Sequence, residues 1–258
     1  MTLQRAGGAS AFSDSAPAYA ETMAPALRPV AEEVVRGAAL RPGEHVLDIG
    51  TGTGTAAAMA VGNRRNVVGL DAAAGMLELA RREVVGAEFV EADFTAIPTE
   101  DRAFDVVISV HALLFADDRV AALREWHRVT APNGRLSLSV PGPDAVVPNT
   151  IFGPVYDRHG ITWGNDYPTE DETVGWAELA GWDSIETGAD ATIAIELDDD
   201  GQFRTWLSIG ARGRATAGWS EERRERLVRD LMEAARRTAD VGFRLPFGAL
   251  YLTARKPG

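Results

Sequence analysis

The chain has 258 residues, 25% of them charged, and a formal net charge of -12, with 26 Lys and Arg against 38 Asp and Glu. It contains no cysteine, which excludes disulfides, thiolate zinc sites and cysteine nucleophiles, and we identify no metal-binding motif. No apolar run approaches the roughly 18 residues of a membrane span, and the N-terminal segment lacks the apolar core of a signal peptide. We therefore expect a cytoplasmic protein with no membrane span.

Acidic residues are concentrated in one region of the chain. Residues 161–200 hold twelve Asp and Glu and no Lys or Arg, which leaves the rest of the chain balanced. A solvated acidic surface accounts for this, and an acidic rim that favours cationic or neutral substrates is the alternative. Neither interpretation favours nucleic acid, whose binding needs a basic surface.

Near the N-terminus, the pattern predicts mixed helix and loop. Pro25 and Pro29 interrupt it, and helical spacing of apolar residues begins at Val30 and ends before Pro42. Short apolar strands then alternate with helices. We expect strands over 45–49, 66–70, 87–90, 104–110 and 135–140, and helices over 55–61, 76–84 and 120–129. This alternation predicts βαβ units and a parallel sheet.

The alternation breaks after Pro141. Helical patterns cover 172–180, 203–209 and 220–238, and strand-like patterns cover 182–187, 192–197 and 250–254. We find no internal repeat and no low-complexity linker. One domain with a helical insertion is the simplest organisation.

A glycine loop after the first strand carries the strongest functional signal. Gly50, Gly52 and Gly54 lie between this strand and the next helix, where glycines let the backbone approach a ligand closely. Asp71 ends the second strand, at the position where an acid binds ribose hydroxyls, and Asp93 follows the third strand. Helix N-capping explains single acids but not their coincidence with the loop.

These residues resemble those of class I S-adenosylmethionine-dependent methyltransferases, on the branch of the ubiquinone and menaquinone type. The resemblance rests on five segments, VLDIGTGTG, VVGLDAAAGMLELAR, FVEADFTAIP, FDVVISVHALLF and ALREWHRVTAPNGRLSLSV. It implies an α/β, Rossmann-like fold with helices on both faces of a seven-stranded, mostly parallel sheet in the order 3-2-1-4-5-7-6. The implied organisation is a cap (1–43), a cofactor-binding core (44–140), an acceptor-side region with strand six (141–197), a helical lid insertion (198–245) and a final strand (246–258).

The resemblance also implies S-adenosylmethionine as the cofactor and assigns roles by position. Expected around the methionine part are Asp48, Gly50, Gly52 and Val110. Asp71 would accept hydrogen bonds from the ribose hydroxyls, and the adenine would contact Ala72, Met76, Asp93 and Phe94. Tyr19, paired with Phe12, resembles a cap over the cofactor. Helix packing is the alternative for Tyr19, and core packing is the alternative for Met76.

Methyl transfer from a sulfonium needs alignment and desolvation, and it needs a base only where the acceptor must lose a proton. His111, at the end of the fourth strand, is the catalytic candidate, and a polar pocket wall is the alternative. We interpret His45 and His127 as structural. Two interpretations are open for a group of residues in the variable stretch after residue 141 and in the insertion: they line the acceptor pocket, or they simply pack the loops. The residues are Tyr156, Arg158, His159, Trp163, Tyr167, Trp206 and Arg212.

Missing motifs favour a small organic acceptor, such as a secondary metabolite or a quinone-like compound. The fourth segment lacks the Asn/Asp-Pro-Pro-Tyr typical of methylation of DNA-base amines, and the absence of cysteine excludes attack on cytosine C5. Oxygen, nitrogen and carbon acceptors all stay open, as does a homodimer.

Three other functions compete with methyl transfer. They are a non-methylating reaction on the same fold, such as a cyclisation, an NAD-dependent oxidoreductase, and a non-catalytic regulatory partner. The loop is GxGxG rather than GxGxxG and the sole lysine is Lys256, which disfavours the oxidoreductase.

Overall fold

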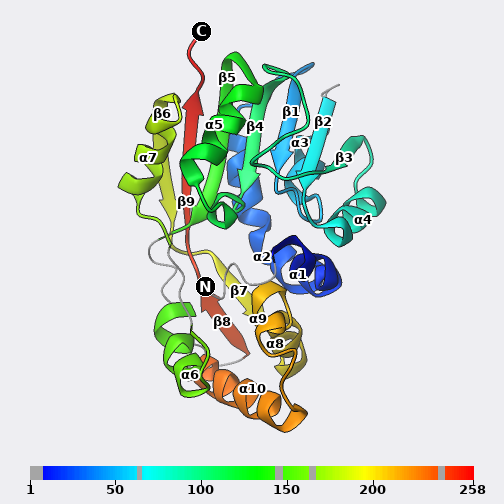
Figure 1. The fold of residues 1–258 in the computed structure, drawn as a ribbon, viewed down its shortest axis with the longest axis vertical. Helices are drawn as coiled ribbons and strands as arrows, with labels where there is room; N and C mark the ends of the chain where they lie inside the picture. Colours follow the sequence, from blue (N-terminus) through cyan, green and yellow to red (C-terminus); the bar gives the residue numbers. More distant parts are fainter. Residues whose placement is uncertain (1–7, 63–65, 143–147, 163–166, 238–241) are drawn as a thin grey trace.

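The structure, a computed structural model, describes residues 8–62, 66–142, 148–162, 167–237 and 242–258 (Figure 1). Its main element is a seven-stranded sheet in the order β3-β2-β1-β4-β5-β9-β6, in which only β9 runs antiparallel to its neighbours. The strands are β1 (His45–Ile49), β2 (Asn66–Asp71), β3 (Ala87–Glu91), β4 (Phe104–Val110), β5 (Thr130–Pro141), β6 (Asp183–Asp190) and β9 (Ala249–Arg255). The predicted strand order 3-2-1-4-5-7-6 is confirmed, with β9 in the position predicted for the seventh strand.

Helices cover both faces of this sheet, as the continuous apolar strands require. Successive residues of β1 point to opposite faces, so Val46 packs in one apolar cluster and Leu47 in the other. The first cluster includes residues of α2 (Ala16–Gly37), α3 (Thr55–Ala60) and α4 (Ala74–Glu83), and the second includes residues of α5 (Arg119–Val129) and α7 (Glu170–Leu179).

Helix α2 runs unbroken through Pro25 and Pro29, so the predicted interruption there is wrong. Both prolines lie on the exposed face, where a carbonyl that loses its helical donor can bond to water. The opposite face buries Leu27, Val30 and Val34. This tertiary burial outweighs the cost of about 3 kcal/mol for each interior proline.

Among the described residues, no helix has both the length and the apolarity to cross a membrane.

Beyond the carboxyl edge of the parallel strands lies a second unit, which we call the lid (Figure 1). Its elements are η3 (Pro148–Phe152), α6 (Gly153–Arg158), β7 (Ala194–Leu197), α8 (Asp200–Leu207), α9 (Gly210–Ala215), α10 (Glu221–Arg236) and β8 (Phe243–Pro246). β7 and β8 form a separate antiparallel pair. We count Phe247 with the lid, because it directly follows β8 and packs in the same apolar cluster. The insertion predicted as helical over 198–245 therefore also contains a strand, β8. This strand is short and pairs with β7, about 50 residues earlier in the chain, and a local sequence pattern does not reveal such a distant partner.

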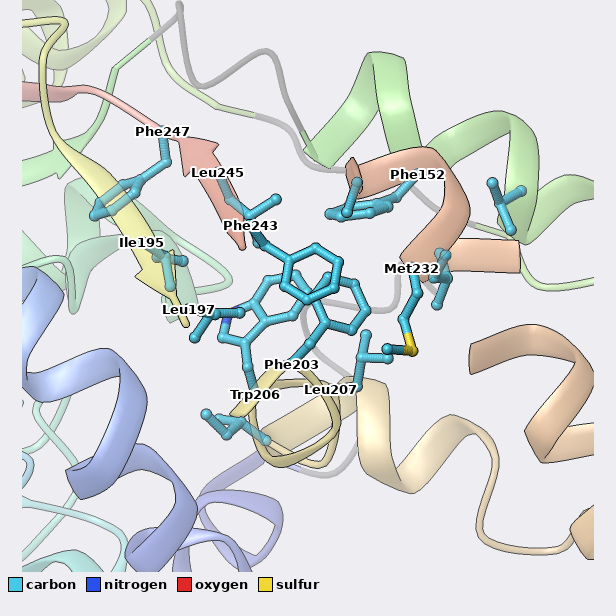
Figure 2. Packing of buried hydrophobic residues seen from close by; sticks show 14 of the residues in the cluster. Phe152, Ile195, Leu197, Phe203, Trp206, Leu207, Met232, Phe243, Leu245 and Phe247 are labelled. Atoms are coloured by element: carbon cyan, nitrogen blue, oxygen red, sulfur yellow. The ribbon is translucent and has the colours of Figure 1, made fainter. Parts of the chain in front are cut away.

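The lid has its own aromatic core, shown in Figure 2. The rings of Phe203 and Phe243 lie 4.5 Å apart between centroids, and Trp206 lies 5.5 Å from Phe203. This core is continuous with Leu27 and Val30 of α2. Helix α2 thus packs against both the sheet and the lid, which fixes the lid over the carboxyl edge of the sheet.

Candidate functional site

The glycine loop connects β1 to α3 at the carboxyl edge of the sheet. The Gly50 and Thr51 N–H groups both donate to the Leu70 carbonyl, at 2.8 and 3.0 Å. Gly50 has a φ of 67°, and a Cβ built on it would lie 2.3 Å from the Cβ of Ala112. Only glycine fits this position, since real Cβ atoms do not approach so closely. The loop is thereby packed against the segment that follows β4.

Asp71 ends β2 and binds the glycine loop with one carboxylate oxygen and the turn before α4 with the other. Oδ2 accepts from the Gly52 N–H at 2.8 Å, and Oδ1 accepts from the Ala73 N–H at 2.9 Å. Burial raises the pKa of Asp71 above its ordinary value, and the backbone donors oppose that shift. Because a carboxylate has about four acceptor positions, Asp71 keeps capacity for further donors such as a pair of hydroxyls.

Asp48 is buried on β1, with 1% of its surface exposed. Its Oδ2 accepts from the Thr51 hydroxyl at 2.7 Å, and within the described part of the chain it has no cationic partner. Burial raises the pKa of Asp48 to about 7, against the effect of the Thr51 hydrogen bond. A buried carboxyl of this kind gains most from a cation placed beside it, and an ammonium group fits that requirement.

Tyr19 of α2 lies over the glycine loop, and α1 (Gly8–Asp14) packs beside it. A Cβ on Gly52 would lie 3.9 Å from the Tyr19 ring, which also makes an edge-on contact with Phe12. Burial raises the pKa of Tyr19, and the charges of Asp71 and Asp48 act in the same direction. The predicted pair of Phe12 and Tyr19 therefore lies together at the loop.

Three of the four residues expected at the adenine follow the ends of β2 and β3, and the fourth, Met76, lies in α4. Asp93 is exposed, and its Oδ1 accepts from the N–H and hydroxyl of Thr95 at 2.8 and 2.7 Å. The Phe94 carbonyl accepts from Trp126 Nε1 at 3.1 Å. Ala72 is exposed just after Asp71. Met76 is only 2% exposed and packs in a small cluster with Ala16 and Ala73.

His111 follows Val110 at the end of β4, in the left-handed conformation with a φ of 55°. Its backbone N–H donates to the Ser139 carbonyl at 3.1 Å, and its Nδ1 lies 3.0 Å from the Ser139 hydroxyl. Nε2 is shielded and has no hydrogen-bond partner among the described residues. The ring also contacts Phe247 edge-on at 5.9 Å. His111 thus connects the carboxyl edge of the sheet to the lid, and its Nε2 has no hydrogen-bond partner among the described residues.

We expect the substitution His111→Gln to weaken the acid dependence of protein stability. Burial lowers the pKa of His111 from 6.5 to about 4, so the unfolded state binds a proton that the native state does not. The contribution of neutral His111 is complete above pH 6.5 and is lost as the pH falls toward 4. Urea unfolding at neutral pH and at about pH 4.5 should show wild type losing about 2 kcal/mol more than the variant. Equal losses would contradict this prediction.

The other histidines make structural contacts. His45 Nε2 lies 3.2 Å from Asn66 Nδ2 at the amino edge of the sheet, and His127 packs edge-on against Trp182. His159 Nε2 lies 2.7 Å from Asp230 Oδ2, which ties α6 to α10 within the lid. Trp163, a predicted acceptor contact, lies outside the described residues.

Three residues near these groups were not singled out from the sequence. Thr51 binds Asp48, Ser139 binds His111, and Phe247 covers the His111 ring. Alternating polar residues in β5 hinted at Ser139, whereas Phe247 carries no sequence signal, because the lid brings it to the site.

The site as a whole fits S-adenosylmethionine. The glycine backbone faces Tyr19 with no side chain between them, and the buried Asp48 carboxyl has no cationic partner among the described residues. Asp71 retains free acceptor positions at the end of β2. A parallel sheet with a glycine loop at its carboxyl edge and an acid on the next strand defines a Rossmann-like nucleotide-binding protein.

Comparisons with known proteins identify the family. A profile described as "Methyltransferase domain" matches residues 47–138. The chain is 32% identical over 165 residues to a demethylmenaquinone methyltransferase of Clavibacter sepedonicus, covering 56% of this chain and 67% of that protein. It is 35% identical over 138 residues to a malonyl-[acyl-carrier protein] O-methyltransferase of Serratia marcescens, covering 54% of each chain. The chain thus spans about half the length of the Serratia protein.

The chain belongs to the class I S-adenosylmethionine-dependent methyltransferase family, with relatives of the ubiquinone and menaquinone type. Solved structures support the fold. The [4+2]-cyclase SpnF aligns with a TM-score of 0.59 at 18% identity, over 89% of this chain and 80% of that one. A Haemonchus contortus phosphoethanolamine N-methyltransferase in complex with S-adenosyl-L-methionine aligns with a TM-score of 0.55 at 20% identity, over 86% and 51% of the two chains.

Proposed function

We propose that this protein transfers a methyl group from S-adenosylmethionine to an oxygen, nitrogen or carbon atom of a small organic molecule. One observation carries the proposal: Asp71 binds the Gly52 N–H of the glycine loop and the Ala73 N–H before α4, and it still has acceptor positions for ribose hydroxyls. Asp48, beneath the same loop, supplies the partner for an ammonium group. The predicted acceptor classes, a secondary metabolite or a quinone-like compound, belong to the same proposal.

S-adenosylmethionine, when bound, supplies a methyl group activated by the positive charge on its sulfur. The residues of this chain then have three tasks. Asp48 and the backbone of Gly50 and Gly52 hold the methionine part, while Asp71 and Asp93 hold the ribose and adenine. Tyr19 covers the loop and excludes water from it. Alignment of donor and acceptor in a dry site provides most of the rate enhancement in a displacement of this type.

His111 is the residue that we assign to the acceptor's proton, where one must be removed. Because its pKa is lowered to about 4, the imidazole is neutral at pH 7. In the tautomer whose Nδ1–H donates to the Ser139 hydroxyl, Nε2 carries an open lone pair. A hydroxyl placed at that nitrogen would donate to it as the methyl group is transferred.

Names of the relatives support methylation of a small acceptor. They include a demethylmenaquinone methyltransferase, a ubiquinone/menaquinone C-methyltransferase of Xanthomonas campestris and malonyl-[acyl-carrier protein] O-methyltransferases. These names cover carbon and oxygen acceptors. The SpnF likeness concerns the fold and keeps a cyclisation as the second candidate.

Titration calorimetry with S-adenosylmethionine, S-adenosylhomocysteine and NAD tests the cofactor assignment. We expect micromolar binding of the first two ligands and none of NAD. Mass spectrometry of products from a panel of phenols, amines and enols then tests the reaction, and we expect a gain of one CH2 unit. A product of unchanged mass would favour cyclisation, and binding of NAD alone would favour the oxidoreductase.

A further inference from the structure

Arg212 of α9 is a cation in the lid that has no acidic partner among the residues that the structure describes. Its guanidinium carbon lies 4.0 Å from the centre of the Trp206 ring. Nε is shielded from solvent, and Arg212 makes no hydrogen bond or ion pair within the described ranges. Arg204 and Arg214 of the same unit are instead paired with carboxylates. Among the described residues, Arg212 is therefore held by packing, with the Trp206 ring as its main contact.

An arginine in this state has unused binding capacity. Its guanidinium has five N–H donors in a planar fork, and an indole face satisfies its charge but none of these donors. Burial lowers the pKa of Arg212, and Tyr156 and Tyr167 nearby act in the opposite direction. A desolvated, unpaired cation is costly, so a bound anion would stabilise it strongly.

The contacts of α9 link Arg212 to the proposed acceptor region near His111. The Gly210 N–H donates to the Ser15 hydroxyl at 3.0 Å, and the Gly210 Cα faces the Phe12 ring. Phe12 in turn makes an edge-on contact with Phe115 of η2 (Leu113–Phe115), just beyond His111, with centroids 5.3 Å apart. Trp206 also shares its apolar cluster with Phe247, which contacts His111. Arg212 is thus carried by a helix that packs against α1, and Phe12 of α1 contacts the segment just beyond β4.

We propose that Arg212 binds a carboxylate of the acceptor, so that the preferred acceptor is an apolar molecule carrying one carboxylate. The inference rests on the proposed function, because it assigns the substrate class of that same site. The planar fork matches a carboxylate bidentately, and the surrounding aromatic residues match an apolar body. A singly charged carboxylate is favoured over a doubly charged phosphate, because a single guanidinium balances one negative charge.

Calorimetry with cinnamate, the uncharged cinnamamide and phenyl phosphate tests the proposal on the full chain. We expect wild type to bind cinnamate about 10-fold or more tightly than cinnamamide, the scale of one charge-assisted hydrogen bond, and more tightly than phenyl phosphate. The substitution Arg212→Met should abolish that preference, and Arg212→Lys should retain part of it. Arg214→Met, which removes a partnered arginine of the same helix, should leave the preference unchanged.

Binding of S-adenosylhomocysteine, measured on the same variants, separates this inference from the proposed function and checks folding. It should stay unchanged in Arg212→Met and Arg212→Lys. Equal binding of cinnamate and cinnamamide by wild type, no binding of cinnamate at millimolar concentration, or an unchanged preference in Arg212→Met would overturn the proposal. So would loss of S-adenosylhomocysteine binding in a folded Arg212→Met variant, because Arg212 would then serve the cofactor. Absence of S-adenosylhomocysteine binding in wild type would instead refute the proposed function, while the cinnamate preference would still report on Arg212.

Discussion

Replacement of Asp71 by alanine is expected to weaken binding of S-adenosylhomocysteine by about 100-fold or more, since two charge-assisted hydrogen bonds to ribose hydroxyls would be lost. The same substitution removes the acceptors of the Gly52 and Ala73 N–H groups, so the loop itself loses its anchor. Asp71→Asn keeps one acceptor oxygen and should bind with intermediate affinity. Titration calorimetry of the purified variants measures the effect.

Asp105→Ala is the matched control for this loss. Asp105 also accepts a backbone N–H from a neighbouring strand, that of His45 at 2.9 Å, but it lies at the amino end of β4. Both alanine variants should lose stability, whereas only Asp71→Ala should lose ligand affinity. Equal affinity in wild type and Asp71→Ala would remove Asp71 from the cofactor site.

Gly50→Ala should be the most damaging single-methyl change in the loop. The added Cβ would lie 2.3 Å from the Cβ of Ala112, and the φ of 67° is unfavourable for any residue with a Cβ. Overpacking and the left-handed backbone together are expected to cost about 3 kcal/mol or more of unfolding free energy. Because Ala112 directly follows His111, the clash displaces both sides of the proposed site, and affinity for S-adenosylhomocysteine should fall by about 10-fold or more.

Two further variants separate the clash from the backbone strain. Gly43 has a φ of 86° with nothing within 4 Å of its Cβ position, so Gly43→Ala should cost only the backbone term of about 1–2 kcal/mol. Combining Gly50→Ala with Ala112→Gly removes the clash and should recover the part of the loss beyond that term. Denaturant unfolding of the four proteins tests this. A Gly50→Ala variant no less stable than Gly43→Ala would show that the loop has room for a side chain.

Much of the sheet and the position of the proposed cofactor site were predictable because they are encoded locally. The continuous apolar runs of β1 and β4 and the glycine loop between β1 and α3 each occupy a short stretch of chain. Asp71 and Asp93 follow strands whose carboxyl ends must meet in a parallel sheet. Their convergence at one edge therefore follows from the order of the elements and needs no knowledge of side-chain packing.

Other features depended on contacts between distant segments. Helix α2 passes through Pro25 and Pro29 because its opposite face is buried against the sheet and the lid. The pairing of β7 with β8 joins segments about 50 residues apart, and strand patterns do not specify such partners. Met76 illustrates the same limit, because helical spacing permits both its buried position and an adenine contact.

The sequence by itself indicated the family through its motifs. The resemblance to that family implied the strand order, which the structure confirms, and the residues that we propose to hold the cofactor. Only the tertiary structure decided the environment of His111 and Arg212. The pKa of His111 is lowered by burial among segments far apart in sequence, and its ring meets Phe247 from the lid. Arg212 is unpaired because folding brings Trp206, and no described carboxylate, to its guanidinium. Whether a side chain is buried or paired depends on which residues the fold brings next to it, and the order of residues along the chain does not specify those neighbours.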